Sequence, residues 1–406
     1  MGRVKEYTLT EEQRGFGPTI ARRLIDDFLS TSRDHIRFTP EYSKRHFFFT
    51  VPTINALTQR PPRRLIRDRH ELINEQAQIA EQIISASPQT ICTVFVDSES
   101  ELPGIRDEFF RASHTLREHH AQGRLDFQVG YVGNSRWAQD LGESVGRITQ
   151  TPQEYQAEFI LPSDRPIAPH NPDRINLPTV VIPLHFEGGD ITTASVNGEN
   201  VVILGPRALH LTRSHYQRIQ GYNITDEDII SILRHAFSAD RVILLTNPAS
   251  EMEPVLAPHI DQLITFPRPG LAVMLDPNSI SEDGGQRSEI IRVLHQYRYQ
   301  LRQAGFRIIT IPTNDSHTEN FQSYTNAIPI TDTETGRTLM IIPSFGDRAI
   351  ESQIRIILEQ EGIDVRFVRN RTFNRGGNTH CITGALARAD NILLQNLSAL
   401  IPRRNV

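Results

Sequence analysis

Hydrophobic residues recur along most of the chain at spacings that alternate between the helical and the extended period. Residues 65–86 place apolar side chains three and four positions apart, which predicts an amphipathic helix, and the run 91–96 predicts a strand. The alternation continues with helices over 103–121, 225–235, 290–301 and 347–360 and strands over 126–132, 241–246, 306–311, 339–343 and 363–369. Strands that alternate with helices predict an α/β protein.

Local signals define where several of these helices begin and end. Thr225, followed three residues later by Asp228, resembles a capping box and predicts a helix start. Asp347 is expected to cap the helix that runs to Gln360, and Gly305 is expected to stop the helix before it.

The first 60 residues follow neither period, although they contain an apolar patch at Phe47–Phe49 and are followed by a Pro-Pro-Arg-Arg breaker. We therefore expect an N-terminal extension over residues 1–60, without an assigned role, and one catalytic domain over residues 61–406. No Gly-rich phosphate loop follows a predicted strand, which argues against a nucleotide-dependent protein. Periodicity does not determine the order of the strands in the sheet.

Composition excludes several classes of protein. Hydrophobic residues make up 38% of the 406 residues, and 43 Lys and Arg against 48 Asp and Glu leave a net charge of -5. Because no basic stripe dominates, nucleic acid is not an expected partner. No apolar run approaches the ~20 residues of a membrane helix, and the N-terminal residues lack a signal peptide, so we expect a cytoplasmic protein. With Cys92 and Cys381 as the only cysteines, a disulfide scaffold is excluded.

Four polar segments lie where predicted strands end, at Arg136–Asp140, Phe186–Asp190, His259–Asp261 and Gly376–Cys381. Each has a structural explanation when taken alone, because Gly-Gly-Asp is usually a turn and a single cysteine usually packs in the core. Their order and spacing along the chain are more informative than any one of them.

Together these segments resemble the guanidino-group-modifying superfamily of arginine, agmatine and peptidylarginine deiminases, dimethylarginine hydrolases and amidinotransferases. The shared pattern is an aspartate in a Trp-containing segment, an acidic Gly-Gly segment, a His-x-Asp pair and a near-terminal cysteine. The resemblance covers roughly residues 130–390. It implies the pentein fold, a five-bladed pseudo-symmetric α/β propeller, and a hydrolase that acts on the C–N bonds of amidines.

The resemblance implies a role for each of four residues, and the chemistry of the guanidinium group supports these roles. Asp140 and Asp261 would grip the planar cation from two edges, because its N–H donors match carboxylates in pairs. Cys381 would attack the guanidinium carbon as a thiolate, and His259 would give a proton to the leaving ammonia and later take one from water. This chemistry requires no cofactor and leaves citrulline when the substrate is arginine.

Two segments point to different branches of the superfamily. Residues 134–143 look most like animal peptidylarginine deiminases, and that resemblance implies that Arg375 contacts the substrate's peptide backbone. We also expect substrate contacts from Trp137 and Glu187. The leading hypothesis is therefore a protein-arginine deiminase, which converts peptidyl arginine to citrulline and ammonia.

The same branch binds calcium beside the aspartate that grips the guanidinium. The resemblance implies a Ca²⁺ site, formed by the side chains of Gln139, Glu143 and Asp190 and the backbone carbonyls of Phe186 and Gly189. A shell made only of oxygen ligands suits this ion.

The segment Glu187–Asp190 instead resembles the free-arginine and agmatine deiminases, in which the glutamate supports the catalytic histidine. Glu187 would then orient His259. The alternative hypothesis is a deiminase or dihydrolase of a small guanidino compound. An amidinotransferase and a non-catalytic pentein that binds a partner are more remote alternatives.

Overall fold

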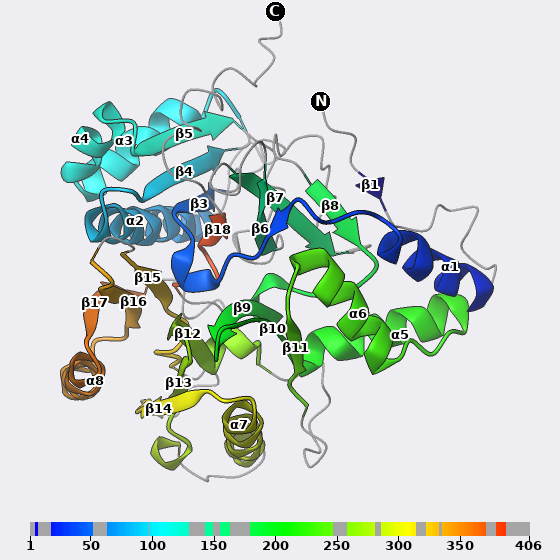
Figure 1. The fold of residues 1–406 in the computed structure, drawn as a ribbon. Coiled ribbons are helices and arrows are strands. Elements are labelled where there is room, and N and C mark those ends of the chain that lie inside the picture. Colours follow the sequence, from blue (N-terminus) through cyan, green and yellow to red (C-terminus); the bar gives the residue numbers. More distant parts are fainter. Residues whose placement is uncertain are drawn as a thin grey trace, which may run out of the picture.

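Figure 1 shows the computed structural model, which describes residues 5–6, 18–51, 63–96, 98–129, 143–148, 155–162, 179–246, 258–280, 286–313, 322–332, 335–370 and 379–386. Most of the predicted helices and strands are confirmed, among them α2 (Arg63–Ala86), β4 (Ile91–Val96) and β17 (Ile363–Arg369). The predicted helix over 103–121 is two helices, α3 (Leu102–Ala112) and α4 (Thr115–Ala121). The chain is extended at Ser113, which separates them.

The predicted helix ends are also confirmed. Thr225 and Asp228 form a reciprocal capping box at the start of α6 (Asp226–Phe237). The Asp347 side chain accepts hydrogen bonds from two backbone amides at the start of α8 (Arg348–Gln360). The left-handed Gly305, with φ of 99°, follows α7 (Gln286–Gln303).

The described residues form five separate sheets. Three of them have three strands each: β9 (Ile191–Val196), β10 (Glu199–Leu204) and β11 (Arg241–Leu244); β12 (Ile264–Arg268), β13 (Leu271–Leu275) and β14 (Arg307–Ile311); β15 (Ile328–Thr331), β16 (Thr338–Ser344) and β17. The fourth contains β18 (Gly384–Leu386), β3 (His46–Val51), β4 and β5 (Leu125–Val129). The fifth contains β1 (Lys5–Glu6), β8 (Thr179–Ile182), β7 (Tyr155–Pro162), β6 (Glu143–Ile148) and β2 (Ile36–Arg37).

One pairing pattern recurs in all five of these sheets. A first strand pairs antiparallel with a second, which in turn pairs parallel with a third. The first strands are β6, β9, β12, β15 and β18, and Figure 1 shows them toward the middle of the molecule. The helices α2–α4, α5 (Pro206–Gln220), α6, α7 and α8 lie toward the outside. Parallel strands require such crossover connections, and here helices provide most of them.

The fourth sheet joins the two ends of the chain. Its second strand, β3, comes from the N-terminal region and pairs with β18 from the C-terminal region and with β4. Every residue of β3 is buried, because the apolar patch at Phe47–Phe49 fills a strand position between two neighbours. Residues before the expected division at residue 60 therefore share a sheet with strands that come after it.

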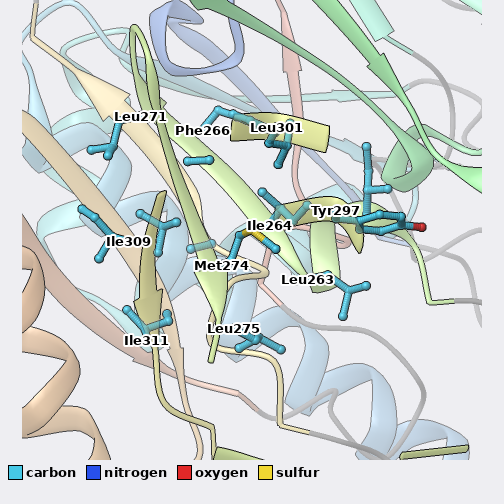
Figure 2. Close-up of a cluster of buried hydrophobic side chains, with 14 of the residues drawn as sticks. Leu263, Ile264, Phe266, Leu271, Met274, Leu275, Tyr297, Leu301, Ile309 and Ile311 are labelled. Carbon is cyan, nitrogen blue, oxygen red and sulfur yellow. The ribbon is translucent and has the colours of Figure 1, made fainter. Parts of the chain in front are cut away.

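Three apolar clusters connect neighbouring sheets. The largest joins strands β9–β14 and helix α7 to residues of β16, β17 and α8, and Figure 2 shows part of it. A second packs α2, α3 and β3–β5 against residues of β15 and β16, and a third packs α1 (Pro18–Leu29), α5 and α6 against β8–β10. Since each cluster draws on more than one sheet, the segments between sheets are held at fixed positions.

Candidate functional site

The polar segments found in the sequence lie immediately before the first strands of different sheets. Gly188–Asp190 forms the 3₁₀ turn η5 before β9, and Ile260–Gln262 forms η7 before β12. His380 and Cys381 occupy the turn before β18, and Asn326 lies two residues before β15. Side chains from four sheets are thus brought to one place.

Cys381 is buried, with 7% of its surface exposed, and its thiol has polar neighbours. The Asn326 side-chain amide donates to Sγ at 3.2 Å, and Sγ donates to Asp261 Oδ2 at 3.6 Å. The side-chain oxygen of Asn326, Oδ1, also accepts from the backbone amides of His380 and Cys381, at 2.9 and 3.3 Å. Asn326 therefore positions both the backbone and the sulfur of Cys381.

Asp261 presents the two oxygens of its carboxylate to different surroundings. Oδ2 interacts with His380 Nδ1 at 3.0 Å and with the Cys381 thiol. Oδ1 is buried and, among the described residues, has no hydrogen-bond partner. A buried carboxylate oxygen without a donor is unfavourable unless a ligand supplies one, so Oδ1 suits the N–H groups of a cation.

His259 is held on one side by Glu187. Its Nε2 lies 2.5 Å from Glu187 Oε2, and Arg207 Nε lies 3.1 Å from the same oxygen. The other ring nitrogen, Nδ1, is 2.6 Å from the point that a Cβ on Gly189 would occupy, and Asp261 Oδ2 is 3.1 Å from that point. With Nε2–H donating to Glu187, Nδ1 is the ring nitrogen that lies on the side of Asp261.

Gly189 is required by this close approach rather than by an unusual backbone angle. Any side chain at this position would meet the His259 ring and the Asp261 carboxylate. The Gly-Gly-Asp turn therefore allows His259 and Asp261 to lie close together.

Asp190 is a structural residue. Its fully buried carboxylate accepts hydrogen bonds from the backbone amides of Ala208 at 2.6 Å, in the first turn of α5, and Ile260 at 3.3 Å. It therefore ties η5 both to α5 and to the turn that carries Asp261. Burial raises the pKa of Asp190 to about 7, although the charges of His259 and Arg207 and the backbone hydrogen bonds oppose this shift.

The calcium site expected from the resemblance is not supported by the described part of the chain. Lys44 Nζ lies 2.5 Å from Glu143 Oε2 and 2.6 Å from Glu41 Oε2, so an ammonium group already neutralises Glu143. The Asp190 carboxylate is committed to backbone amides, and Phe186 packs in an apolar cluster. Among the described residues no group of three or more His, Cys, Asp or Glu side chains could hold a metal ion.

Four of the predicted site residues, Trp137, Gln139, Asp140 and Arg375, lie outside the described residues. The described ones divide into two groups. Cys381, Asp261, His259 and Glu187 come together around Gly189, whereas Glu143 and Asp190 take part in structural contacts.

Sequence reasoning missed the roles of several residues that hold the site together. Asn326 positions Cys381, His380 contacts Asp261, and Arg207 contacts Glu187. Glu41 lies 3.7 Å from the other ring nitrogen of His380 and is bound to Lys44. Asn326 precedes the first strand of a sheet, as the other site segments do, and this placement could have identified it. For Glu41 and Lys44 the sequence held no comparable signal.

No helix in the described ranges is long and apolar enough to cross a lipid bilayer.

Solved structures of two agmatine deiminases are similar to this chain in fold. The chain superposes on a structure of C. jejuni agmatine deiminase with a TM-score of 0.56 and 16% identity, covering 88% of this chain and 97% of that one. For the agmatine deiminase of Enterococcus faecalis the TM-score is 0.58 with 15% identity, covering 89% and 97% of the two chains. At such identities the similarity establishes the mixed α/β fold alone. Comparison with curated proteins gives no significant match.

The sequence itself carries the family assignment. The model of the Porphyromonas-type peptidyl-arginine deiminase family matches residues 60–386, which include the four polar segments found in the sequence. This match agrees with the guanidino-group-modifying superfamily expected from the motifs, whose deiminases hydrolyse C–N bonds. The chain therefore belongs to the Porphyromonas-type peptidyl-arginine deiminase family.

Proposed function

We propose that the protein deiminates a guanidinium group, with Cys381 as the nucleophile and ammonia as the leaving group. The observation that carries this proposal is the meeting of Cys381, Asp261 and the His259–Glu187 pair beside Gly189. A thiol, a carboxylate and an imidazole held by a second carboxylate are the groups that attack on a cationic carbon requires.

The substrate cation would bind through its N–H donors to Asp261 Oδ1, the buried oxygen that has no partner among the described residues. Asp140 would grip the opposite edge. It precedes β6 by three residues, and segments before the first strands of the other sheets supply the rest of the site. The positive charge would also favour a thiolate at Cys381, as a nearby cation lowers a thiol's pKa.

In the first half of the reaction, the Cys381 thiolate forms a C–S bond to the guanidinium carbon and gives a neutral tetrahedral adduct. His259, protonated at Nδ1, passes that proton to one amino group, which leaves as ammonia when the C–N bond breaks. The product is a planar thiouronium cation bound to sulfur. Glu187 stabilises the imidazolium before the transfer, because its carboxylate lies at Nε2.

In the second half, His259 takes a proton from water at Nδ1, and the oxygen forms a C–O bond to the thiouronium carbon. The C–S bond then breaks, the thiolate returns, and the ureido product loses its O–H proton to solvent. Ammonia takes up one proton as ammonium. The overall balance is guanidinium plus water to urea group plus ammonium.

Two substrate classes fit this site, and a different observation favours each. The family match favours peptidyl arginine, converted to citrulline, as the leading substrate. The contact between Glu187 and His259 favours a small guanidino compound, because that glutamate resembles the free-arginine and agmatine deiminases. The two solved structures of agmatine deiminases fit the small-molecule class as well as the family match fits the peptidyl class.

We also propose that the five sheets with their common pairing pattern form the five-bladed pentein propeller. The support is the recurrence of one strand arrangement in every described sheet and the central position of the first strands in Figure 1.

The experiment that tests the function compares an N-blocked arginine amide, free arginine and agmatine as substrates. Ammonia and the ureido product are measured for each, with Cys381→Ala as the control. Turnover of the blocked amide would establish the peptidyl class, and turnover of free arginine or agmatine alone would establish the small-molecule class. If the wild-type protein turned over none of the three substrates, the proposal would be contradicted.

A further inference from the structure

His380, the neighbour of the nucleophile, lies between two carboxylates. Its Nδ1 is 3.0 Å from Asp261 Oδ2, and its Nε2 is 3.7 Å from Glu41 Oε1. A neutral imidazole has one N–H and would face one of these carboxylates with a lone pair, whereas an imidazolium donates toward both. Burial acts to lower the pKa of His380, but hydrogen bonds and charge from Asp261 and Glu41 raise it to about 10.

Behind His380 the charges are also paired within the protein. Glu41 shares Lys44 with Glu143, and the three side chains are buried. The Lys44 and His380 charges hold the pKa of Glu41 down to about 2, although burial opposes them. Burial raises the pKa of Glu143 to about 7, although the charge of Lys44 opposes this shift.

This arrangement fixes the direction in which Asp261 points. His380 and the Cys381 thiol both contact Asp261 Oδ2, whereas Asp261 Oδ1 has no hydrogen-bond partner among the described residues. If the His380 ring were absent, the carboxylate could turn about its terminal bond and take other partners. A freely turning carboxylate would lose part of its ability to bind a planar, bidentate cation.

We propose that His380, backed by Glu41, is a positioning residue for substrate recognition that holds Asp261 Oδ2 so that Oδ1 faces the guanidinium. Both ring nitrogens of His380 face protein carboxylates, so neither has an N–H available for the substrate. This distinguishes it from His259, whose Nδ1 faces the site. The segment before β3 thereby acquires a function, because it supplies the Glu41 carboxylate.

The inference rests on the proposed deiminase function, and its test is a set of variants assayed on the best substrate of the wild-type protein. His380→Ala removes the ring, His380→Asn keeps an amide donor near the position of Nδ1, and Glu41→Gln removes the second charge. His295→Asn is the matched control, since His295 is an exposed residue of α7. Thermal unfolding establishes that each variant is folded.

We expect KM for His380→Ala to rise by about tenfold to a hundredfold, with a smaller change in kcat, because the lost interaction acts on substrate binding. His380→Asn should recover most of this loss, and Glu41→Gln should fall between wild type and alanine. The same order is expected for substrate dissociation constants measured in a Cys381→Ala background. These readouts keep the test valid if His380→Ala does not fold.

A purely structural role would lower the melting temperature of these variants and leave KM at the wild-type value, which would overturn this inference alone. Equal KM values for His380→Asn and His380→Ala would also overturn it, because the donor to Asp261 would then be irrelevant. Silence of the wild-type protein on every guanidino substrate is a separate outcome that overturns the proposed function itself.

Discussion

The two cysteines of the chain are both buried, and their surroundings differ in polarity. Cys92 lies within β4 between Phe47 and Leu125 of the neighbouring strands, inside an apolar cluster and 1% exposed. Cys381 is 7% exposed and lies in a turn beside the Asn326 amide and the Asp261 carboxylate. Exposure therefore hardly distinguishes the two thiols, whereas the polar groups around each sulfur do.

The pKa of Cys92 shows what burial without compensation does. Burial raises it far above the usual range of a thiol, and the charge of Arg124 only partly opposes this. Cys381 instead lies beside the Asn326 amide and the Asp261 carboxylate, and His380 contacts the same carboxylate. The difference comes from position: Cys92 is within a strand, and Cys381 precedes one at the place where the sheets meet.

The largest expected effect is on Cys381 itself. Cys381→Ala should lower kcat by at least about a thousandfold, because the covalent step is lost. Cys92→Ala should leave kcat within a few-fold and destabilise the fold by about 0.5–3 kcal/mol through lost core packing. Steady-state ammonia release and thermal unfolding measure the two effects. Equal activity of Cys381→Ala and Cys92→Ala would show that Cys381 is not the nucleophile.

The next largest effect is expected at Glu187, the carboxylate that contacts His259 near Cys381. Glu187→Gln should lower kcat by about tenfold to a hundredfold, since the glutamine keeps a hydrogen bond to His259 but no longer stabilises the imidazolium. Glu199→Gln, at an exposed glutamate paired with Arg241, is the control and should not change the rate. A full pH–rate profile of both variants checks this, and wild-type kcat in Glu187→Gln would remove Glu187 from the mechanism.

Gly189→Ala should lower kcat/KM by about tenfold or more, because a Cβ there would displace the His259 ring from its position beside Asp261. The control is Gly104→Ala in α3, where a Cβ would have no neighbour within 4 Å and alanine is expected to stabilise the helix by up to about 1 kcal/mol. If Gly189→Ala left activity unchanged, as expected for Gly104→Ala, the close approach of His259 and Asp261 at Gly189 would not be needed for catalysis.

A smaller effect is expected on the pH dependence of stability. The pKa of His380 is raised from 6.5 to about 10 in the fold, so its stabilising contribution is complete below pH 6.5 and is lost as the pH rises through 10. The charged groups that face it are Asp261 and Glu41, with Lys44 behind Glu41. The difference in melting temperature between wild type and His380→Asn should therefore shrink from pH 6.5 to 10. A melting-temperature difference that stays constant over this pH range would contradict a charged imidazolium at His380.

The smallest expected effect is that of metal removal. Lys44 neutralises Glu143, and backbone amides satisfy Asp190, so a chelator should leave kcat and KM unchanged. Activity measured with added calcium and with chelator tests this directly. A strong calcium requirement would restore the ion site implied by the animal enzymes.

Local structure was the easier part to predict from the sequence. The strand over 91–96, the strand over 363–369 and the capping box at Thr225 were all predicted correctly, because each depends on neighbouring residues. The candidate residues Asp261, His259 and Cys381 were predicted from the order of motifs, which does not depend on strand order, and the structure brings them close together. The division at residue 60 stays a prediction. The strand β3 lies before that residue and pairs with β4 and β18, which both come after it.

The supporting contacts could not be predicted, since they join residues far apart in the chain. Glu41 meets His380 across more than 300 residues, and Lys44 meets Glu143 across 99. Neither pair has a periodic or spacing signal. The calcium prediction is not supported for a similar reason: nothing near Glu143 in the sequence indicates that Lys44, from the N-terminal region, binds its carboxylate.

The most direct test of the central claim is the intact mass of the protein acid-quenched during turnover, followed by peptide mapping. We expect a mass increase equal to the substrate minus ammonia, located on Cys381, with none on Cys92 and none in Cys381→Ala. Turnover with no adduct on Cys381, or with the adduct on another residue, would contradict a thiouronium intermediate at this cysteine.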